Sequence, residues 1–125
     1  MKQEKTFAFI WIALGVIAGA LGAHALKKVL LPEALDSFKT GVLYQLFAGT
    51  WLLLLPKPKQ SPSRLFSSSR LITIGSLFFS LSIYALVLFP LMGISAKFLG
   101  PVTPIGGTFM IAGLIKAAIE QKQVD

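Results

Sequence analysis

Long apolar runs constrain this chain more than any other feature of its sequence. The first, residues 7–26, contains no charged residue and has the roughly 20 residues that an α-helix needs to cross the apolar layer of a membrane. Further apolar runs occupy residues 39–55, 71–91 and 103–119. The sequence therefore predicts an all-α protein with four transmembrane helices in a single membrane domain.

The composition excludes an ordinary soluble domain. Apolar residues make up 54% of the 125 residues and charged residues 14%, whereas globular proteins carry about 25% charged residues. A small soluble domain needs polar groups over most of its surface, because its surface-to-volume ratio is high. The 12 Lys and Arg residues lie at the ends of the apolar runs and not along one face. The net charge of +7 therefore favours membrane lipids, and not nucleic acid, as partners.

A polar-flanked segment, residues 27–40, separates the first two apolar runs. Pro32 suits the first turn of a helix, and Glu33 suits its positively polarised N-terminal end. This pattern predicts a short interfacial helix before the second span. After the second span, Pro and Ser dominate residues 56–70, which we interpret as a linker. The expected architecture is an up-and-down bundle of four helices.

The distribution of basic residues predicts the orientation. With four spans, both termini and residues 56–70 share one side, which holds eight of the 12 Lys and Arg residues and leaves four on the other. Because cytoplasmic segments carry the excess of basic residues, we expect both termini in the cytoplasm. Ala23-His24-Ala25 has the pattern of a signal-peptide cleavage site, but the first apolar run is long for a signal peptide. We therefore expect the first span to be retained.

Small residues at regular spacing predict where the helices pack. Gly15 and Gly19 are four apart in the first run, and Gly75 and Ser82 are seven apart in the third. Helix association in lipid depends on close van der Waals contact, which small residues allow. We interpret these residues as packing positions within one bundle.

Polar residues and glycines also gather at one expected depth, in the outer leaflet. These candidate binding residues are His24, Tyr44, Gln45, Ser80, Tyr84, Thr103, Gly106 and Gly107. An unpaired polar group in apolar surroundings costs on the order of a few kcal/mol, so we expect these groups to meet, with His24 hydrogen-bonded to another member. His24 either binds a ligand or proton or has only a structural hydrogen bond. The glycines of the fourth run should let that helix approach the first.

Four short motifs give the sequence a resemblance to a known family. They are Gly22-Ala23-His24-Ala25-Leu26, the stretch from Phe38 through Thr40-Gly41 to Tyr44-Gln45, Phe79-Ser80 with Tyr84, and Thr103-Pro104-Ile105-Gly106-Gly107. The chain resembles the domain of unknown function 423 family, also called the transmembrane protein 256-like family, of small bacterial inner-membrane and mitochondrial proteins. The resemblance implies a four-helix protein of the inner (plasma) membrane and implies no activity, substrate or cofactor. The family usually has a histidine soon after Tyr44-Gln45, where this chain has Phe47-Ala48-Gly49.

Three hypotheses about function follow. The first is a non-enzymatic protein that binds lipid, docks on a larger membrane complex or self-associates. The second is a small transporter, which the apolar middles of the spans disfavour. The third is an enzyme or a quinone-binding or other ligand-binding protein that uses His24 with Tyr44 or Tyr84. One histidine, no cysteine and no acidic residue within the runs predict no catalytic residue, metal site or cofactor, so we favour the first hypothesis.

Overall fold

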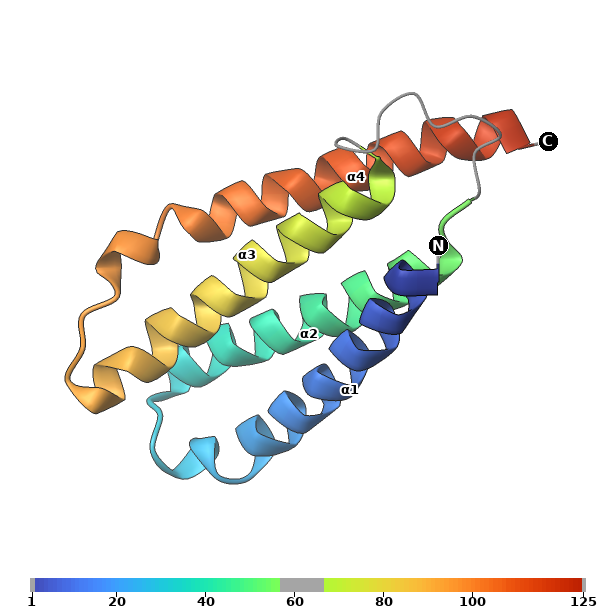
Figure 1. Ribbon diagram of the computed structural model, residues 1–125. Coiled ribbons are helices and arrows are strands. Elements are labelled where there is room, and N and C mark those ends of the chain that lie inside the picture. The colour runs from blue at the N-terminus through green and yellow to red at the C-terminus, as the bar shows by residue number, and fades with distance from the viewer. Residues whose placement is uncertain (1, 57–66, 125) are drawn as a thin grey trace.

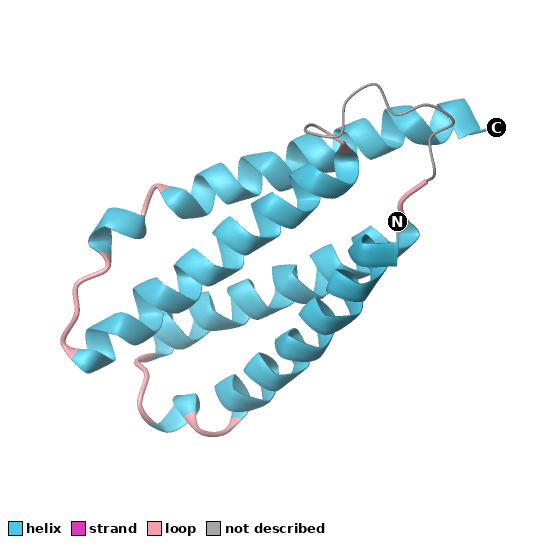
Figure 2. Ribbon diagram, in the orientation of Figure 1, coloured by secondary structure: helices cyan, strands magenta, loops and turns pink. Residues whose placement is uncertain are grey.

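The computed structural model describes residues 2–56 and 67–124, and all regular structure in these two ranges is helical (Figure 2). The elements are α1 (Lys2–Ala23), η1 (Leu26–Lys28), α2 (Pro32–Leu54), α3 (Ser68–Leu88), η2 (Phe89–Met92), η3 (Lys97–Leu99) and α4 (Val102–Val124). The α-helices run alternately up and down, and residues 24–31 and 89–101 lie together at what we call the loop end (Figure 1). The all-α prediction is confirmed.

The expected interfacial helix is not a separate element. α2 runs without interruption from Pro32 to Leu54. Leu31 before it is extended (φ −65°, ψ 154°), as a residue before proline prefers, and Pro32 and Glu33 then begin the helix. The amphipathic pattern ahead of the second apolar run therefore belongs to the first turns of α2.

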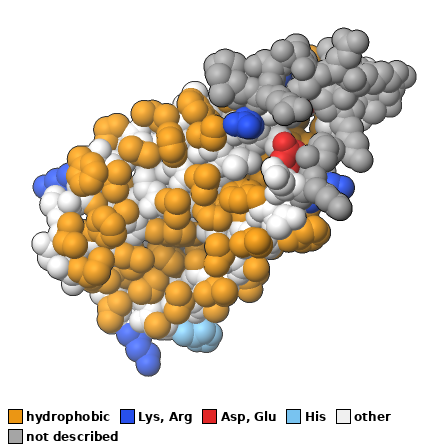
Figure 3. All heavy atoms as spheres, viewed as in Figure 1, with side chains coloured by type: hydrophobic (Ala, Val, Ile, Leu, Met, Phe, Trp, Pro, Cys, Tyr) orange, Lys and Arg blue, Asp and Glu red, His pale blue; other side chains and the backbone are white. Residues whose placement is uncertain are grey.

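Within residues 2–56 and 67–124, three segments are long and apolar enough to cross a membrane, namely Gln3–Lys28, Ser68–Met92 and Lys97–Lys122. α2 is not among them, although it has 23 residues, because no 18-residue stretch of it is apolar enough. Figure 3 shows hydrophobic side chains over most of the visible face, with the described Lys and Arg side chains toward its ends.

α3 is the central helix of the described structure. It packs extensively on α2 through one face and on α4 through another, whereas α4 makes few contacts with α1 or α2. The helices therefore follow one another in space in chain order, α1 to α4, and do not close into a symmetrical bundle (Figure 1). The expected approach of the fourth helix to the first is wrong, because the glycines of α4 pack on α3 instead.

Glycines bring α3 and α4 into backbone contact. A Cβ atom at Gly75 would lie 2.7 Å from the carbonyl oxygen of Gly106, and one at Gly106 would lie 2.5 Å from the backbone nitrogen of Phe79. At Gly113, a Cβ would lie 2.7 Å from Cγ1 of Ile72. Because backbone atoms cannot move aside as flexible side chains can, Gly75 and Gly106 require the absence of a side chain.

Hydrogen bonds hold the same interface at both ends. The Ser68 hydroxyl donates to Oε2 of Glu120 at 3.2 Å, and the hydroxyls of Ser82 and Thr103 are 2.6 Å apart. Ser68, Ser82 and Glu120 are all buried. The position of α4 along α3 is thus set by polar pairs that flank the glycine contact.

The glycine contact predicts opposite effects for two neighbouring substitutions. Gly106→Ala should lower the free energy of unfolding by about 1–3 kcal/mol, because the new methyl group meets backbone. Gly107→Ala is the matched control, since its Cβ would meet only the Phe79 ring at 3.6 Å. Alanine there should be neutral or stabilising by up to about 1 kcal/mol, because it favours the helix. Thermal unfolding in mild detergent measures both, and equal effects would contradict the interface.

Candidate functional site

A groove of about 800 Å³ opens at the loop end between α2 and α4, above α3. One wall is the start of α2 and the segment before it, with Val29, Leu30, Leu31, Glu33, Ala34, Ser37 and Thr40. The floor is apolar, and it is formed by Phe79, Ile83, Leu86, Val87, Pro90 and Leu91 of α3 and η2. The other wall is the start of α4 and the residue before it, with Gly100, Thr103 and Pro104. Its volume lies within the roughly 300–1,000 Å³ of small-molecule sites.

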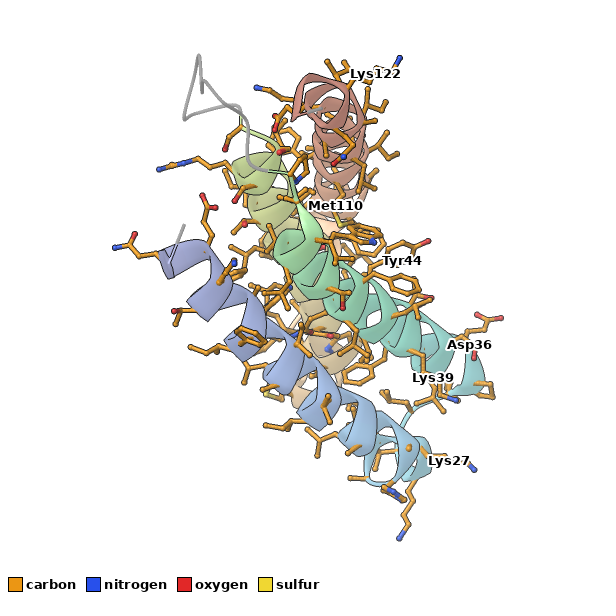
Figure 4. The ribbon with its side chains drawn as sticks, turned by 90° about the vertical axis from the view of Figure 1, so that its right-hand side faces the viewer. Lys27, Asp36, Lys39, Tyr44, Met110 and Lys122 are labelled. Atoms are coloured by element: carbon orange, nitrogen blue, oxygen red, sulfur yellow. The ribbon has the colours of Figure 1, made fainter. Side chains whose placement is uncertain are left out.

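The groove ends where the side chains of α2 change in size. Thr40 and Tyr44 are four residues apart and share a helix face. The side chains on this face are therefore small near the loop end, and an aromatic ring follows beyond them. The Tyr44 ring packs edge-on against the Phe79 ring, with centroids 5.2 Å apart. Further along, Tyr44 and Trp51 pack against the buried cluster that includes Met110 of α4 (Figure 4). The Tyr44–Phe79 pair therefore closes the groove part-way along the helices.

Gln45, beside this closure, links three helices through a buried hydrogen-bond network. Its amide nitrogen donates to the carbonyl oxygen of Trp11 at 3.0 Å, and its amide oxygen accepts from the Tyr84 hydroxyl at 2.5 Å. The Trp11 indole nitrogen in turn donates to the Ser76 hydroxyl at 2.7 Å. Gln45 is 2% exposed and Ser76 is fully buried. The network joins α1, α2 and α3 at one level.

The other predicted site residues have separate partners. Ser80 is fully buried and donates to the carbonyl oxygen of Gly41 at 2.7 Å. Thr103 pairs with Ser82, as described above, and Gly107 lies beside the Phe79 ring. Tyr44 has ring contacts with Phe47 and Phe79 but no side-chain hydrogen bond to the described chain. The predicted single cluster is thus several separate pairs, and Gln45 with Tyr84 is the one side-chain hydrogen bond between two of its members.

His24 does not join these residues, so the expected hydrogen bond is wrong. α1 ends at Ala23, earlier than the apolar run suggested, and His24 lies in the exposed turn that follows. Its side chain makes no hydrogen bond within residues 2–56 and 67–124. A histidine at the water boundary, close to Lys27 and Lys28, is solvated without a protein partner, which removes the energetic reason for the expected contact.

Trp11 and Ser76 belong to the network and were not among the predicted site residues. Each has a signal in the sequence. A tryptophan in the middle of an aliphatic run needs an acceptor for its indole N–H. Ser76, Ser80 and Tyr84 recur every four residues, which places them on one face of α3. In the described part of the chain, every buried side-chain nitrogen or oxygen has a partner, so the buried polar groups of this network are paired within the protein.

The network predicts that Gln45 matters for stability and His24 does not. Gln45→Leu leaves the Tyr84 hydroxyl without its acceptor and should lower the free energy of unfolding in detergent by about 1–3 kcal/mol. His24→Ala should change it by less than about 0.5 kcal/mol. Adding Tyr84→Phe to Gln45→Leu should cost less than the sum of the single changes, by about 0.6–1.7 kcal/mol. A loss of stability in His24→Ala equal to that in Gln45→Leu would refute this assignment.

Comparison with known proteins places the chain among membrane proteins. Residues 18–107 match the family described as protein of unknown function, DUF423. The UPF0382 membrane protein C1782.12c of Schizosaccharomyces pombe is 39% identical over 102 residues, which cover 80% of this chain and 85% of that protein. The UPF0382 membrane protein SAB0533 of Staphylococcus aureus is 35% identical, over 85% of this chain and 84% of its own. The UPF0382 inner membrane protein YgdD of Escherichia coli K12 is 34% identical, with 84% and 75% covered. No solved structure matches.

Proposed function

This chain belongs to the DUF423 family and is a membrane protein, and from that premise we propose that it is a non-enzymatic lipid-binding protein with four transmembrane helices. The groove between α2 and α4 is the lipid site in this proposal. It holds one acyl chain, drawn sideways from the leaflet at the loop end.

In this proposal α2 also crosses the membrane, in addition to the three segments that are apolar enough by composition. Its charged residues, Glu33, Asp36 and Lys39, all lie within its first eight residues at the loop end, where headgroups and water reach them (Figure 4). Its one strongly polar residue deeper in the helix, Gln45, is paired inside the protein. With four spans, the excess of basic residues at the termini and linker supports an outward-facing loop end. Three of those basic residues, Lys57, Lys59 and Arg64, lie outside the described residues.

The depth of the groove is the observation that carries the lipid assignment. Its floor extends along α3 from Phe79 to Val87, a rise of about 12 Å at about 1.5 Å per residue, and continues into η2. Half of the roughly 30 Å apolar layer of a bilayer is about 15 Å. A groove that begins at the loop end and closes at mid-membrane matches a chain from one leaflet. A partner's transmembrane helix would instead need an open path along the full length of α2 and α4.

The exposure of His24 argues against the competing hypotheses. An enzyme or a quinone-binding protein built on this cluster needed His24 beside Tyr44 or Tyr84, and a transporter would use the outer polar cluster around His24 as an entry site. The structure places His24 in an exposed turn and uses the Tyr84 hydroxyl inside the packing network. A site that holds an apolar chain without reacting with it needs no titratable group, which agrees with the apolar floor of the groove.

The proposed orientation is tested by labelling single cysteines, because the natural chain has none. Ser95→Cys lies exposed at the loop end and Gln121→Cys lies exposed near the end of α4. In intact cells, a membrane-impermeant maleimide should label position 95 and should label position 121 only after the membrane is opened. The reverse pattern would overturn the orientation, and labelling of both from outside would overturn the even number of spans.

Lipid binding is tested by filling the groove. Thr40→Phe places a ring between α2 and the floor and should remove most of the lipid that remains bound after mild-detergent purification, measured by native mass spectrometry. Thr50→Phe is the matched control, since both threonines are exposed on α2 and donate to the carbonyl four residues earlier, but only Thr40 lines the groove. Equal lipid retention in the two variants would refute the site.

A further inference from the structure

We propose that the groove selects phospholipids whose headgroup carries a primary ammonium, and that Glu33 is the residue that recognises it. This inference rests on the proposed lipid-binding function and adds the chemical class of the ligand. Of the described residues that line the groove, Glu33 alone is charged. It lies in the first turn of α2, toward the loop end of the groove, where the apolar residues Val29, Leu30 and Leu31 also line it.

The order of groups on the α2 wall follows the order of groups in a phospholipid. Glu33, Ser37 and Thr40 share one helix face, and they lead from the loop end of the groove inward. Ser37 lies about 6 Å below Glu33 at about 1.5 Å per residue, and its exposed hydroxyl makes no side-chain hydrogen bond within residues 2–56 and 67–124. A carboxylate, then a free hydroxyl, then an apolar floor fit an ammonium headgroup, an ester carbonyl and an acyl chain.

The charged residues at the loop end favour a lipid headgroup that carries both a positive and a negative charge. Lys27, Lys28, Lys39 and Lys97 accompany Glu33 and Asp36 there. Figure 4 shows Lys27, Asp36 and Lys39 at this end, opposite Lys122. The lysines complement a lipid phosphate, and the Glu33 carboxylate at the groove complements a cation beside it.

Hydrogen bonding to a carboxylate distinguishes a primary ammonium headgroup from the quaternary ammonium of choline. A primary ammonium has three N–H donors and forms a charge-assisted bond with a carboxylate, which is about twice as strong as a neutral hydrogen bond. The quaternary ammonium of choline has no N–H to donate. A glycerol headgroup carries no cation for the Glu33 carboxylate to bind. Ethanolamine lipids should therefore bind better than choline or glycerol lipids with the same chains.

Glu33 also stabilises the positively polarised start of α2, and this structural role needs its own control. Asp36 provides it, because it is the other carboxylate near the start of α2 and does not line the groove. A role limited to helix stability would give Glu33→Gln and Asp36→Asn the same lipid preference as the natural chain.

The test is native mass spectrometry of the full chain released from nanodiscs with equal amounts of phosphatidylethanolamine, phosphatidylcholine and phosphatidylglycerol of identical chains. The natural chain and Asp36→Asn should bind the ethanolamine lipid about tenfold better than the choline lipid, or about 1.4 kcal/mol. Glu33→Gln should bind the two about equally, and Glu33→Lys should favour the glycerol lipid. Circular dichroism confirms that each variant is folded.

The outcomes separate this inference from the function on which it rests. If Thr40→Phe removes lipid but the natural chain shows no headgroup preference, the groove binds acyl chains and the Glu33 assignment is wrong. An ethanolamine preference that survives in Glu33→Gln also overturns it, as does a preference of the natural chain for the glycerol lipid. If Thr40→Phe retains lipid as Thr50→Phe does, the lipid-binding function itself fails.

Discussion

The amide of Gln45 is buried among three helices, so both of its polar atoms must find partners inside the protein. An unpaired amide there would cost several kcal/mol. The Trp11 carbonyl and the Tyr84 hydroxyl supply the partners, and the Trp11 indole extends the network to Ser76. These bonds align α1, α2 and α3 at one level, and glycines of α1 and α2 make room for side chains of the facing helix, as Gly19 does for Val42. The other contacts of the first three helices are arranged around this network.

The groove follows from the way α4 joins this three-helix unit. Gly75 and Gly106 hold α4 against α3 by backbone contact, which leaves α4 to one side of α2. The space between α2 and α4 is then filled or open according to the side chains of α2. Tyr44 and Trp51 fill it toward the termini, while Ser37 and Thr40 leave it open toward the loop end. The side chains on one face of α2 thus determine which half of the space between α2 and α4 is filled and which half is open.

Sequence reasoning found the helices and the family, because each depends on composition or motif, and it expected Gln45 and Tyr84 at one depth without predicting that they pair. It placed Gly75 and Ser82 correctly on a packing face of α3. It did not find which helices are neighbours, because hydrophobic runs define the lengths of helices and not their lateral order. The contact of α3 with α4 depends on which helix the glycines of α4 face, and the sequence does not give that. His24 was misplaced because the end of α1 is decided by the turn after Ala23. The groove depends on that lateral order and was not predicted.

Photocrosslinking from within the bilayer tests the central claim, that a lipid chain occupies the groove, most directly. A phospholipid with a diazirine at the end of one acyl chain would be incorporated into nanodiscs with the full chain, and the adducts mapped by peptide mass spectrometry. Adducts should concentrate near Phe79 and Ile83, above the level on Val16 and Ile17, which are exposed on α1 at a similar depth. Even labelling of both helices, or less on α3 than on α1, would contradict the account.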